Sequence, residues 1–284
     1  MIKDIFKGKR SLLSFEVFPP KKEDEFEQAF HVLDKLALLN PDFISVTYGA
    51  GGSNSKKTVE IASYIHNTLG INALAHLTCV GSKEADLLAV CKELEEANIS
   101  HVLALRGDRP RLMTNEQFDN RDYKYASEMT RFLKEYTNLN ITAACYPEKH
   151  YEAVSMRSDI THLKEKVDAG ADFLITQLFF DNDSFYDFRE KIRAAGINVP
   201  ICTGIMPITS AKQLGTTVSL SGSSIPKAFS DIIANYGDQP EEMRKAGIDY
   251  AIRQIRDLKE NDSDGIHIYS MNKPKMTSEI VENI

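Results

Sequence analysis

The chain has 284 residues, of which 42% are apolar, and a formal net charge of -7, so it is long enough to bury the core of one large domain or two small ones. No stretch combines basic residues with interleaved aromatics, which argues against a nucleic-acid partner, and no apolar run approaches the roughly 20 residues that a membrane helix needs. The four cysteines are widely spaced without a CxxC pair, and the N-terminus lacks a signal-peptide pattern, so we expect a cytoplasmic protein without a metal site or disulfides.

Short apolar runs alternate with segments of helical periodicity along the chain. Helical patterns are seen, for example, at 25–40, 55–70, 82–98 and 156–170. The predicted strands lie at 12–18, 42–50, 71–79, 101–108, 141–148, 172–181, 199–207 and 265–272. The residues at predicted helix ends are Gly70, Asn98, Gly170 and Gly196. Nearly continuous apolar strands between helices indicate a parallel sheet covered on both faces.

Eight such units in a chain of this length predict an α/β fold of the (β/α)8 barrel type, with residues 1–284 forming a single domain. A doubly wound sheet is the alternative. Two helical stretches, near 226–236 and 240–260, separate the last two predicted strands. The polar stretch at 109–123 is predicted to be a long, mobile loop.

The run SFEVFPP at residues 14–20 places a carboxylate inside the first predicted strand. In extended geometry Ser14, Glu16 and Phe18 share one face. A buried carboxylate is costly unless it is paired or used. Its apolar neighbours should favour the protonated form, which suits a general acid. The two prolines are expected to stop the strand and to leave Glu16 at its tip.

Polar residues stand at the C-terminal ends of nearly all the predicted strands, which is where barrels of this type carry their chemistry. These residues are Glu16, Thr47, Tyr48, His76, Thr78, Arg106, Asp108, Tyr146, Glu148, Gln177, Tyr269 and Asn272. Glu16 and Asp108 come from different sides of the barrel mouth and suggest two carboxylates with separate roles. We expect the neighbouring Arg106 to keep Asp108 ionised.

Three further features have two interpretations each. The glycine-rich stretch at 48–53 is either a turn close to a ligand or a phosphate-binding loop. His76 is a hydrogen-bonding residue or, less expected without a second ligand nearby, a metal ligand. Lys166 lies in the N-terminal half of a predicted helix, where it is either solvated or in contact with a ligand phosphate.

As a set, the motifs FEVFPP, FISVTYGAGG, AHLTC, LALRGD, AACYPE, KVDAGADFLITQLFFD and GIMPI resemble those of the methylenetetrahydrofolate reductase family. The resemblance follows the same order over almost the whole chain and is closest to the short bacterial enzymes. It implies one catalytic barrel without the regulatory domain of longer relatives, and a homo-oligomer such as a dimer or tetramer. The implied activity is the reduction of 5,10-methylenetetrahydrofolate to 5-methyltetrahydrofolate, which feeds methionine synthesis and one-carbon metabolism.

The resemblance further implies bound FAD and a ping-pong cycle in which NAD(P)H, with NADH favoured, reduces the flavin before the folate takes its place. Glu16 matches the family's general acid, and Asp108 matches an acidic residue near pterin and flavin. Positions that resemble cofactor contacts are Thr47, His76, Arg106, Gly107, Asp108, Ala144, Tyr146, His150, Asp159, His162 and Lys166. Positions that resemble substrate contacts are Glu16, Asp108, Gln177, Gln213, Tyr269 and Lys273.

The chain departs from the better-known bacterial enzymes at three of these places. Thr217 replaces a phenylalanine that covers the ligand, with Leu214 as a substitute, while His162 replaces an asparagine and Lys273 an arginine. Three other readings stay open. They are a flavin-free barrel that holds a pterin through Asp108 and Asn272, a catalytically silent binding protein, and a Schiff-base aldolase. The aldolase is disfavoured because no predicted strand carries an interior lysine.

Overall fold

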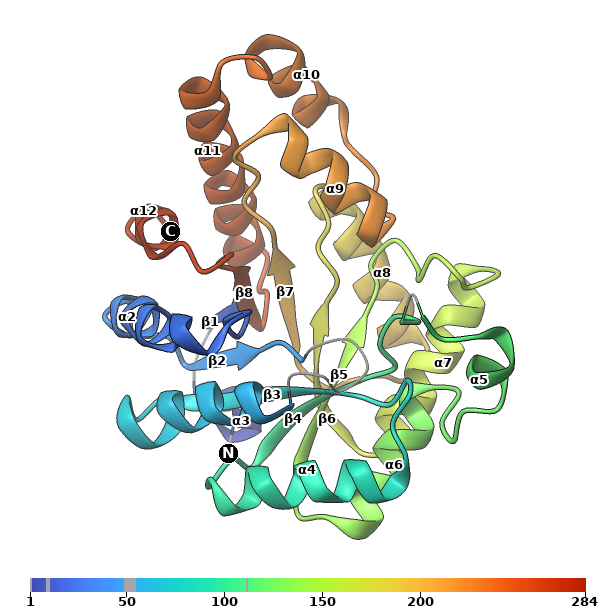
Figure 1. The fold of residues 1–284 in the computed structure, drawn as a ribbon. Coiled ribbons are helices and arrows are strands. Elements are labelled where there is room, and N and C mark those ends of the chain that lie inside the picture. The colour runs from blue at the N-terminus through green and yellow to red at the C-terminus, as the bar shows by residue number, and fades with distance from the viewer. Residues whose placement is uncertain (1, 9–10, 49–54, 111) are drawn as a thin grey trace.

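A computed structural model describes residues 2–8, 11–48, 55–110 and 112–284, and its strands close into a barrel in chain order (Figure 1). The strands are β1 Leu12–Val17, β2 Phe43–Val46, β3 Asn72–Thr78, β4 His101–Leu105, β5 Asn140–Cys145, β6 Ala171–Thr176, β7 Ile201–Ile205 and β8 Gly265–Tyr269. Each strand pairs in parallel with its neighbours, and β8 pairs with β1. The predicted (β/α)8 barrel is confirmed, and the doubly wound alternative is wrong.

Helices cover the outside of the barrel, apart from the first one, which lies at its N-terminal end (Figure 1). They are α1 Ile2–Ile5, α2 Phe26–Ala37, α3 Ser55–Ser63, α4 Glu84–Glu96, α5 Asn115–Asp119, α6 Ala126–Tyr136, α7 Met156–Asp168, α8 Asn182–Ala194, α9 Ala211–Ser221, α10 Lys227–Tyr236, α11 Pro240–Glu260 and α12 Pro274–Val281. Short 3-10 and π turns, at Glu23–Glu25 and Tyr64–Thr68, adjoin α2 and α3. The four predicted stop residues all have positive φ, as expected of residues that end helices in the left-handed conformation.

Two parts of the chain elaborate the regular pattern. Between β7 and β8, helices α9, α10 and the long α11 extend to one side of the barrel, in the upper part of Figure 1, around a separate apolar cluster. The segment predicted as a long loop contains helix α5, which begins with Thr114 accepting a hydrogen bond from the Gln117 N–H. That local cap accounts for a short helix in a polar sequence.

The strand alternation sorts side chains between two cores. Phe15 and Val17 of β1 point outward into the large core beneath the helices. Ser14 and Glu16 point inward, as the alternation predicts. After β1 ends at Val17, the side-chain amide of Asn272 pairs with both the N–H and the C=O of Phe18, at 3.1 and 2.9 Å. Asn272 therefore secures the exit of the strand, which leaves its amide engaged by the protein.

The N-terminal end of the barrel is filled by apolar side chains and by α1. Ile2 is fully buried there, and its N–H donates a hydrogen bond of 3.0 Å to Nε2 of His101. Phe6 packs on Phe173 with ring centroids 5.3 Å apart. The inward-facing polar residues are consequently gathered toward the opposite, C-terminal end of the strands.

Candidate active site

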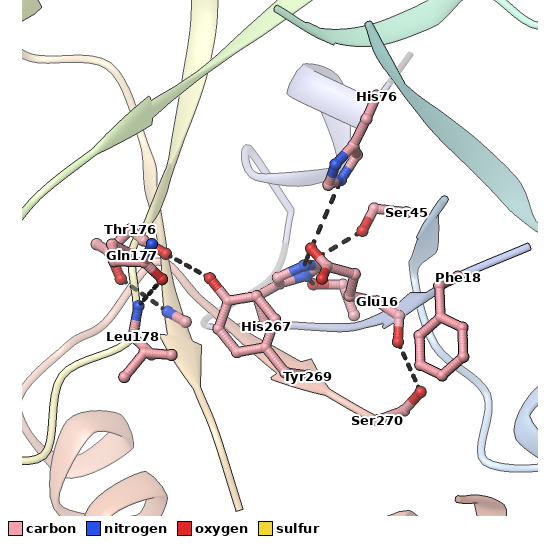
Figure 2. Close-up of polar contacts among 12 residues, drawn as sticks. Glu16, Phe18, Ser45, His76, Thr176, Gln177, Leu178, His267, Tyr269 and Ser270 are labelled. Atoms are coloured by element: carbon pink, nitrogen blue, oxygen red, sulfur yellow. Dashed lines mark hydrogen bonds and ion pairs between the residues drawn. The ribbon is translucent and has the colours of Figure 1, made fainter. Parts of the chain in front are cut away.

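Glu16 lies between two imidazoles inside the barrel (Figure 2). The register of β1 places it beside Ser45 of β2 and Tyr269 of β8. Its Oε2 is 3.6 Å from Nε2 of His76 and 3.8 Å from Nε2 of His267, and its side chain is 22% exposed. A carboxyl group that faces both solvent and two nitrogen bases can exchange a proton with a ligand in the mouth.

His76 is buried and electrically neutral near pH 7. Burial lowers the pKa of its imidazole to about 4. Its Nε2 has no hydrogen-bond partner among the described residues, although the nearby carboxyl group is within 3.6 Å. A buried ring nitrogen without a partner is costly, so this atom is a candidate contact for a polar ligand group.

The mouth contains a cavity of about 300 Å³ above Glu16. Its wall gathers residues from most of the strand ends. Of the predicted site residues, those that line it are Glu16, Thr47, His76, Arg106, Gly107, Asp108, Ala144, Tyr146, His150, Gln177 and Tyr269. The expectation that these positions converge is therefore correct in its geometry.

Tyr269 crosses the cavity floor from β8 to β6, and it has room to do so because β7 carries Gly204 beneath its ring. Its hydroxyl donates a hydrogen bond of 2.9 Å to the carbonyl oxygen of Thr176, as Figure 2 shows. A Cβ atom on Gly204 would lie only 2.7 Å from that hydroxyl, so a larger residue would displace the ring. Burial raises the pKa of the phenol well above its usual value, which keeps Tyr269 neutral.

A second cavity, also of about 300 Å³, adjoins the first on the side of β4, β5 and α7. Leu105, Arg106, Ala144, Tyr146 and His150 line both cavities. The remaining predicted cofactor residues line the second one. They are Asp159, His162 and Lys166. The two cavities together form an elongated site that leads from the barrel interior to its rim.

Lys166 is not a solvated helix residue, and it lies in the last turn of α7 rather than in its N-terminal half. Its ammonium donates a hydrogen bond of 3.0 Å to the carbonyl of Ala144 and lies 5.7 Å from the centroid of the Tyr146 ring. Burial lowers the pKa of this amine, and Asp159 partly offsets that effect. The side chain is therefore directed inward, toward the second cavity.

Arg106 pairs with Glu152 instead of serving as the counter-ion of Asp108. The guanidinium makes a two-point contact with the carboxylate, in which Nη2 donates to Oε1 at 3.0 Å and Nη1 donates to Oε2. This pair holds the pKa of Glu152 at about 2. The sequence does not reveal this carboxylate, which lies 46 positions away from Arg106, and the expectation that Arg106 keeps Asp108 ionised stays a prediction.

Gly107 allows the turn that presents Arg106 and Asp108 to the two cavities. It has a φ of +81°, and a Cβ atom there would lie 2.8 Å from Val80 Cγ1. Next to this turn, His150 meets Tyr146 edge-on at 4.8 Å and receives a hydrogen bond from the Glu152 N–H on Nδ1. Burial lowers the pKa of His150, so its ring is a neutral part of the wall.

Some predicted residues lie away from the cavities that the described residues form. The Gln213 amide closes the loop before α9, since Oε1 accepts from the Thr209 N–H at 2.9 Å and Nε2 donates to the Pro207 carbonyl at 3.0 Å. Lys273 is exposed at the start of α12. Leu214 is buried in the cluster beneath α9, so it does not cover a ligand. Of the glycine-rich stretch at 48–53, residues 49–53 lie outside the described residues.

Two site residues were missed by the sequence reasoning. His267 alternates with Tyr269 along β8, so the period of two that placed Tyr269 inward also applied to it. Glu152 had no comparable signal, because it lies in a loop after β5. Within the described ranges, no group of three or more metal-ligating side chains occurs, and all four cysteines are buried thiols. In the same residues, no helix has the length and apolar character to cross a membrane.

Comparison with protein families supports the resemblance seen in the motifs. A profile of the methylenetetrahydrofolate reductase family matches residues 1–284. The 5,10-methylenetetrahydrofolate reductases of Pectobacterium carotovorum and Escherichia coli K12 are 34% and 33% identical over 272 residues, which is 96% of this chain and 89% and 90% of those proteins. Arabidopsis thaliana methylenetetrahydrofolate reductase (NADH) 1 is 33% identical over all of this chain and half of its own length.

Solved structures that resemble this chain share its fold at low sequence identity. An uncharacterised Clostridium thermocellum protein that binds two copies of 5-methyl-5,6,7,8-tetrahydrofolic acid superposes with a TM-score of 0.70 at 14% identity, over all of this chain and 98% of that one. Xanthomonas albilineans dihydropteroate synthase in complex with 7,8-dihydropteroate gives 0.53 at 11% identity, over 96% and 91%. At these identities the likeness concerns the barrel fold alone.

Proposed function

The chain belongs to the methylenetetrahydrofolate reductase family, and we propose that it uses bound FAD and NADH to reduce 5,10-methylenetetrahydrofolate to 5-methyltetrahydrofolate. The observation that carries this proposal is Glu16, held between His76 and His267 at the closed end of a cavity that Asp108 and Gln177 also line. One acid group and several hydrogen-bonding groups at one point suit a substrate whose nitrogen must be protonated before its carbon can accept hydride.

The elongated site has features that fit a flavin dinucleotide. At the inner end, the unpartnered Nε2 of His76 offers a polar contact to a heteroaromatic ring. At the outer end, the Lys166 ammonium has three protons and donates one of them to the Ala144 carbonyl, and Arg106 lies beside it in the same wall. The inward-directed Lys166 ammonium suits a diphosphate, and Arg106 adds positive charge to the same wall although its guanidinium is paired with Glu152. When bound there, FAD would supply the hydride transfer that amino-acid side chains cannot perform.

Glu16 would act on the folate as a general acid. A protonated Glu16 donates its proton to the amine nitrogen that leaves when the five-membered ring opens, and the resulting iminium carbon then accepts hydride. The apolar cluster that fills the N-terminal end of the barrel keeps bulk water from reaching Glu16 from that side. The partial exposure of the Glu16 side chain shows that its carboxyl group is accessible from the mouth.

Asp108 and Gln177 would hold the pterin ring. A carboxylate accepts hydrogen bonds from ring N–H and amino groups, which are abundant on pterins. The Gln177 Oε1 accepts a hydrogen bond of 2.9 Å from the Leu178 N–H, and this fixes the amide with its NH2 group available to a ligand. Tyr269 would form the floor under that ring, since it spans the cavity between β8 and β6.

NADH is proposed as the reductant, and the two substrates would use the same cavity in turn. The Arabidopsis relative carries NADH in its name, which supports this choice over NADPH. The cavity of about 300 Å³ that Glu16 and His76 line would also receive the flavin ring, so it is too small to hold the folate and the nicotinamide together. Alternating occupancy leads to ping-pong kinetics, in which oxidised nicotinamide leaves before the folate binds.

The test is an anaerobic visible spectrum of the purified protein, followed by addition of NADH and then of methylenetetrahydrofolate. A yellow spectrum that bleaches with NADH and recovers with the folate supports both half-reactions. The chain contains no tryptophan, so the near-ultraviolet background is low. A protein that stays colourless after incubation with FAD contradicts the flavin assignment and favours a flavin-free pterin-binding barrel.

A further inference from the structure

The turn that joins α9 to α10 is fastened to the barrel by two hydrogen bonds from serine residues. The Ser224 N–H donates to Oε2 of Glu148, which follows β5, at 2.9 Å. The Ser223 hydroxyl donates to the carbonyl oxygen of Leu178, which follows β6, at 2.8 Å, and this serine is only 5% exposed. The two bonds therefore connect the helical extension in the upper part of Figure 1 to the C-terminal ends of β5 and β6.

Leu178 continues this connection to Gln177. Its N–H donates to Oε1 of the Gln177 side chain at 2.9 Å, as Figure 2 shows, while its carbonyl oxygen accepts from Ser223. The Leu178 side chain is buried in the same apolar cluster as Phe180 and Phe229. The peptide groups on both sides of the Leu178 Cα are thus held, and the direction of its N–H determines where the Gln177 amide points.

Glu148 has no role in the proposed chemistry, although its place after β5 is typical of a site residue in a barrel. It is not among the residues that line the two cavities. Its Oε1 is buried and has no hydrogen-bond partner among the described residues, so the contact of Oε2 with Ser224 is the interaction that this carboxyl group makes there. Glu148 is therefore connected to the site through the turn that it holds.

We propose that Glu148 and Ser223 are positioning residues that set the orientation of the Gln177 amide, and with it the affinity for the folate, from outside the cavity. This inference rests on the proposed function, in which Gln177 holds the pterin, and deepens it. The path consists of the three hydrogen bonds described above, each between a side chain and a backbone group. Since neither positioning residue lines the cavity, both act on binding of the folate and not on the proton or hydride steps.

Two substitutions interrupt the path at different points. Glu148→Ala removes the acceptor for the Ser224 N–H, and Ser223→Ala removes the donor to the Leu178 carbonyl. Each should raise KM for the folate about three- to tenfold, the effect of losing one net hydrogen bond, while kcat and the reduction by NADH stay unchanged. The double variant E148A/S223A should be no worse than the more affected single variant, because both changes act through the same contact.

Glu148→Gln is the conservative variant at the first of these points. It keeps a side-chain oxygen that accepts from the Ser224 N–H, so KM for the folate should stay normal. A defect in E148Q equal to that in E148A would overturn the inference, because the contact with Ser224 would then not be the cause.

Amide hydrogen exchange of the ligand-free protein tests the path without turnover. The Leu178 N–H donates to the Gln177 side chain, so its exchange rate reports how firmly that amide is held. In E148A and S223A this N–H should exchange about three- to tenfold faster than in the unmodified protein. Gln177→Ala removes the acceptor itself and should give the upper limit of the rate.

The matched control is Asp86→Ala. Asp86 also accepts a hydrogen bond from a backbone N–H, that of Lys83 at 3.1 Å, but it lies in the first turn of α4 on the outside of the barrel. Its loss should change neither KM for the folate nor exchange at Leu178.

A normal KM for the folate in S223A, or normal exchange at Leu178 in that variant, overturns the inference. S223A also decides the matter if E148A does not fold. If the unmodified protein binds no flavin, the proposed function fails, whereas exchange at Leu178 still decides whether Glu148 and Ser223 hold the Gln177 amide.

Discussion

Replacing Gly204 with alanine should disturb the floor of the candidate site by displacing the Tyr269 ring. The new Cβ would lie 2.7 Å from the Tyr269 hydroxyl and 2.9 Å from Cε2 of its ring, and closer still to the carbonyl oxygen of Thr176. Atoms cannot remain at those separations, so the tyrosine must move. Its movement breaks the hydrogen bond of 2.9 Å between the hydroxyl and Thr176.

Two costs add up in this variant. Overpacking a core typically costs about 1–3 kcal/mol, and a buried polar pair left without its hydrogen bond costs about 1–3 kcal/mol. We therefore expect the free energy of unfolding to fall by about 3 kcal/mol, which corresponds to a decrease in Tm of roughly 6–12 °C. Because Tyr269 also lines the cavity, KM for the folate should rise while reduction of the protein by NADH changes less.

Chemical denaturation and steady-state kinetics of the same preparation measure both effects. Gly215→Ala is the matched control, since Gly215 lies within helix α9 with nothing within 4 Å of an added Cβ. That control should stabilise the protein by about 0.5–1 kcal/mol, because alanine is the better helix former. A Gly204→Ala variant whose stability and folate KM match those of the unmodified protein would show that Tyr269 is not held as described.

Glu16→Gln should bind flavin and be reduced by NADH at nearly the normal rate but should lose folate reduction by about 10²–10⁴-fold, the usual contribution of a general acid; normal turnover would exclude that role. Asp108→Asn should weaken folate use more than flavin retention, and unchanged folate kinetics would count against its contact with the pterin. Glu152→Gln frees Arg106 for an anionic ligand, so FAD titration of apoprotein should give a Kd about three- to tenfold lower, whereas weaker binding would mean that Glu152 orients Arg106. Burial lowers the pKa of His101 to about 4, so between pH 6.5 and 4 this imidazole is protonated in the unfolded chain but not in the folded protein. Proton binding therefore favours unfolding, and Tm should fall as pH decreases over this range, less steeply in His101→Asn.

Much of the fold followed from local patterns in the sequence. Apolar runs and helix stop residues such as Gly70 and Gly196 predicted all eight strands, because parallel barrel strands are buried on both faces and helices end where φ becomes positive. The inward direction of Glu16 also followed, since alternation along β1 is a local property. In a (β/α)8 barrel the C-terminal ends of the strands meet at one mouth, and this alone predicted that the strand-end residues lie close together. Most of them line the cavity there.

The rest depended on contacts between distant parts of the chain. Nothing in the sequence near Arg106 indicates that Glu152 will pair with it, and helical periodicity does not reveal that the long Lys166 side chain reaches inward to Ala144. Gln213 stands in a matching motif, yet its amide is engaged by the local loop. Such choices between partners are made by tertiary packing, which a pattern of residue types does not encode.

The closed floor of the barrel has a kinetic consequence. Ile2, Phe43 and Phe173 belong to the apolar cluster that fills the end of the barrel away from the mouth. Within the part of the chain that the structure describes, a molecule that reaches Glu16 must therefore retreat along the path by which it arrived. A product that dissociates slowly would then block the binding of the next substrate. Excess folate should therefore inhibit turnover by binding before NADH has reduced the protein. Because the site is open at one end only, a compound that joins a pterin to a nicotinamide-like ring should inhibit by filling it from the mouth.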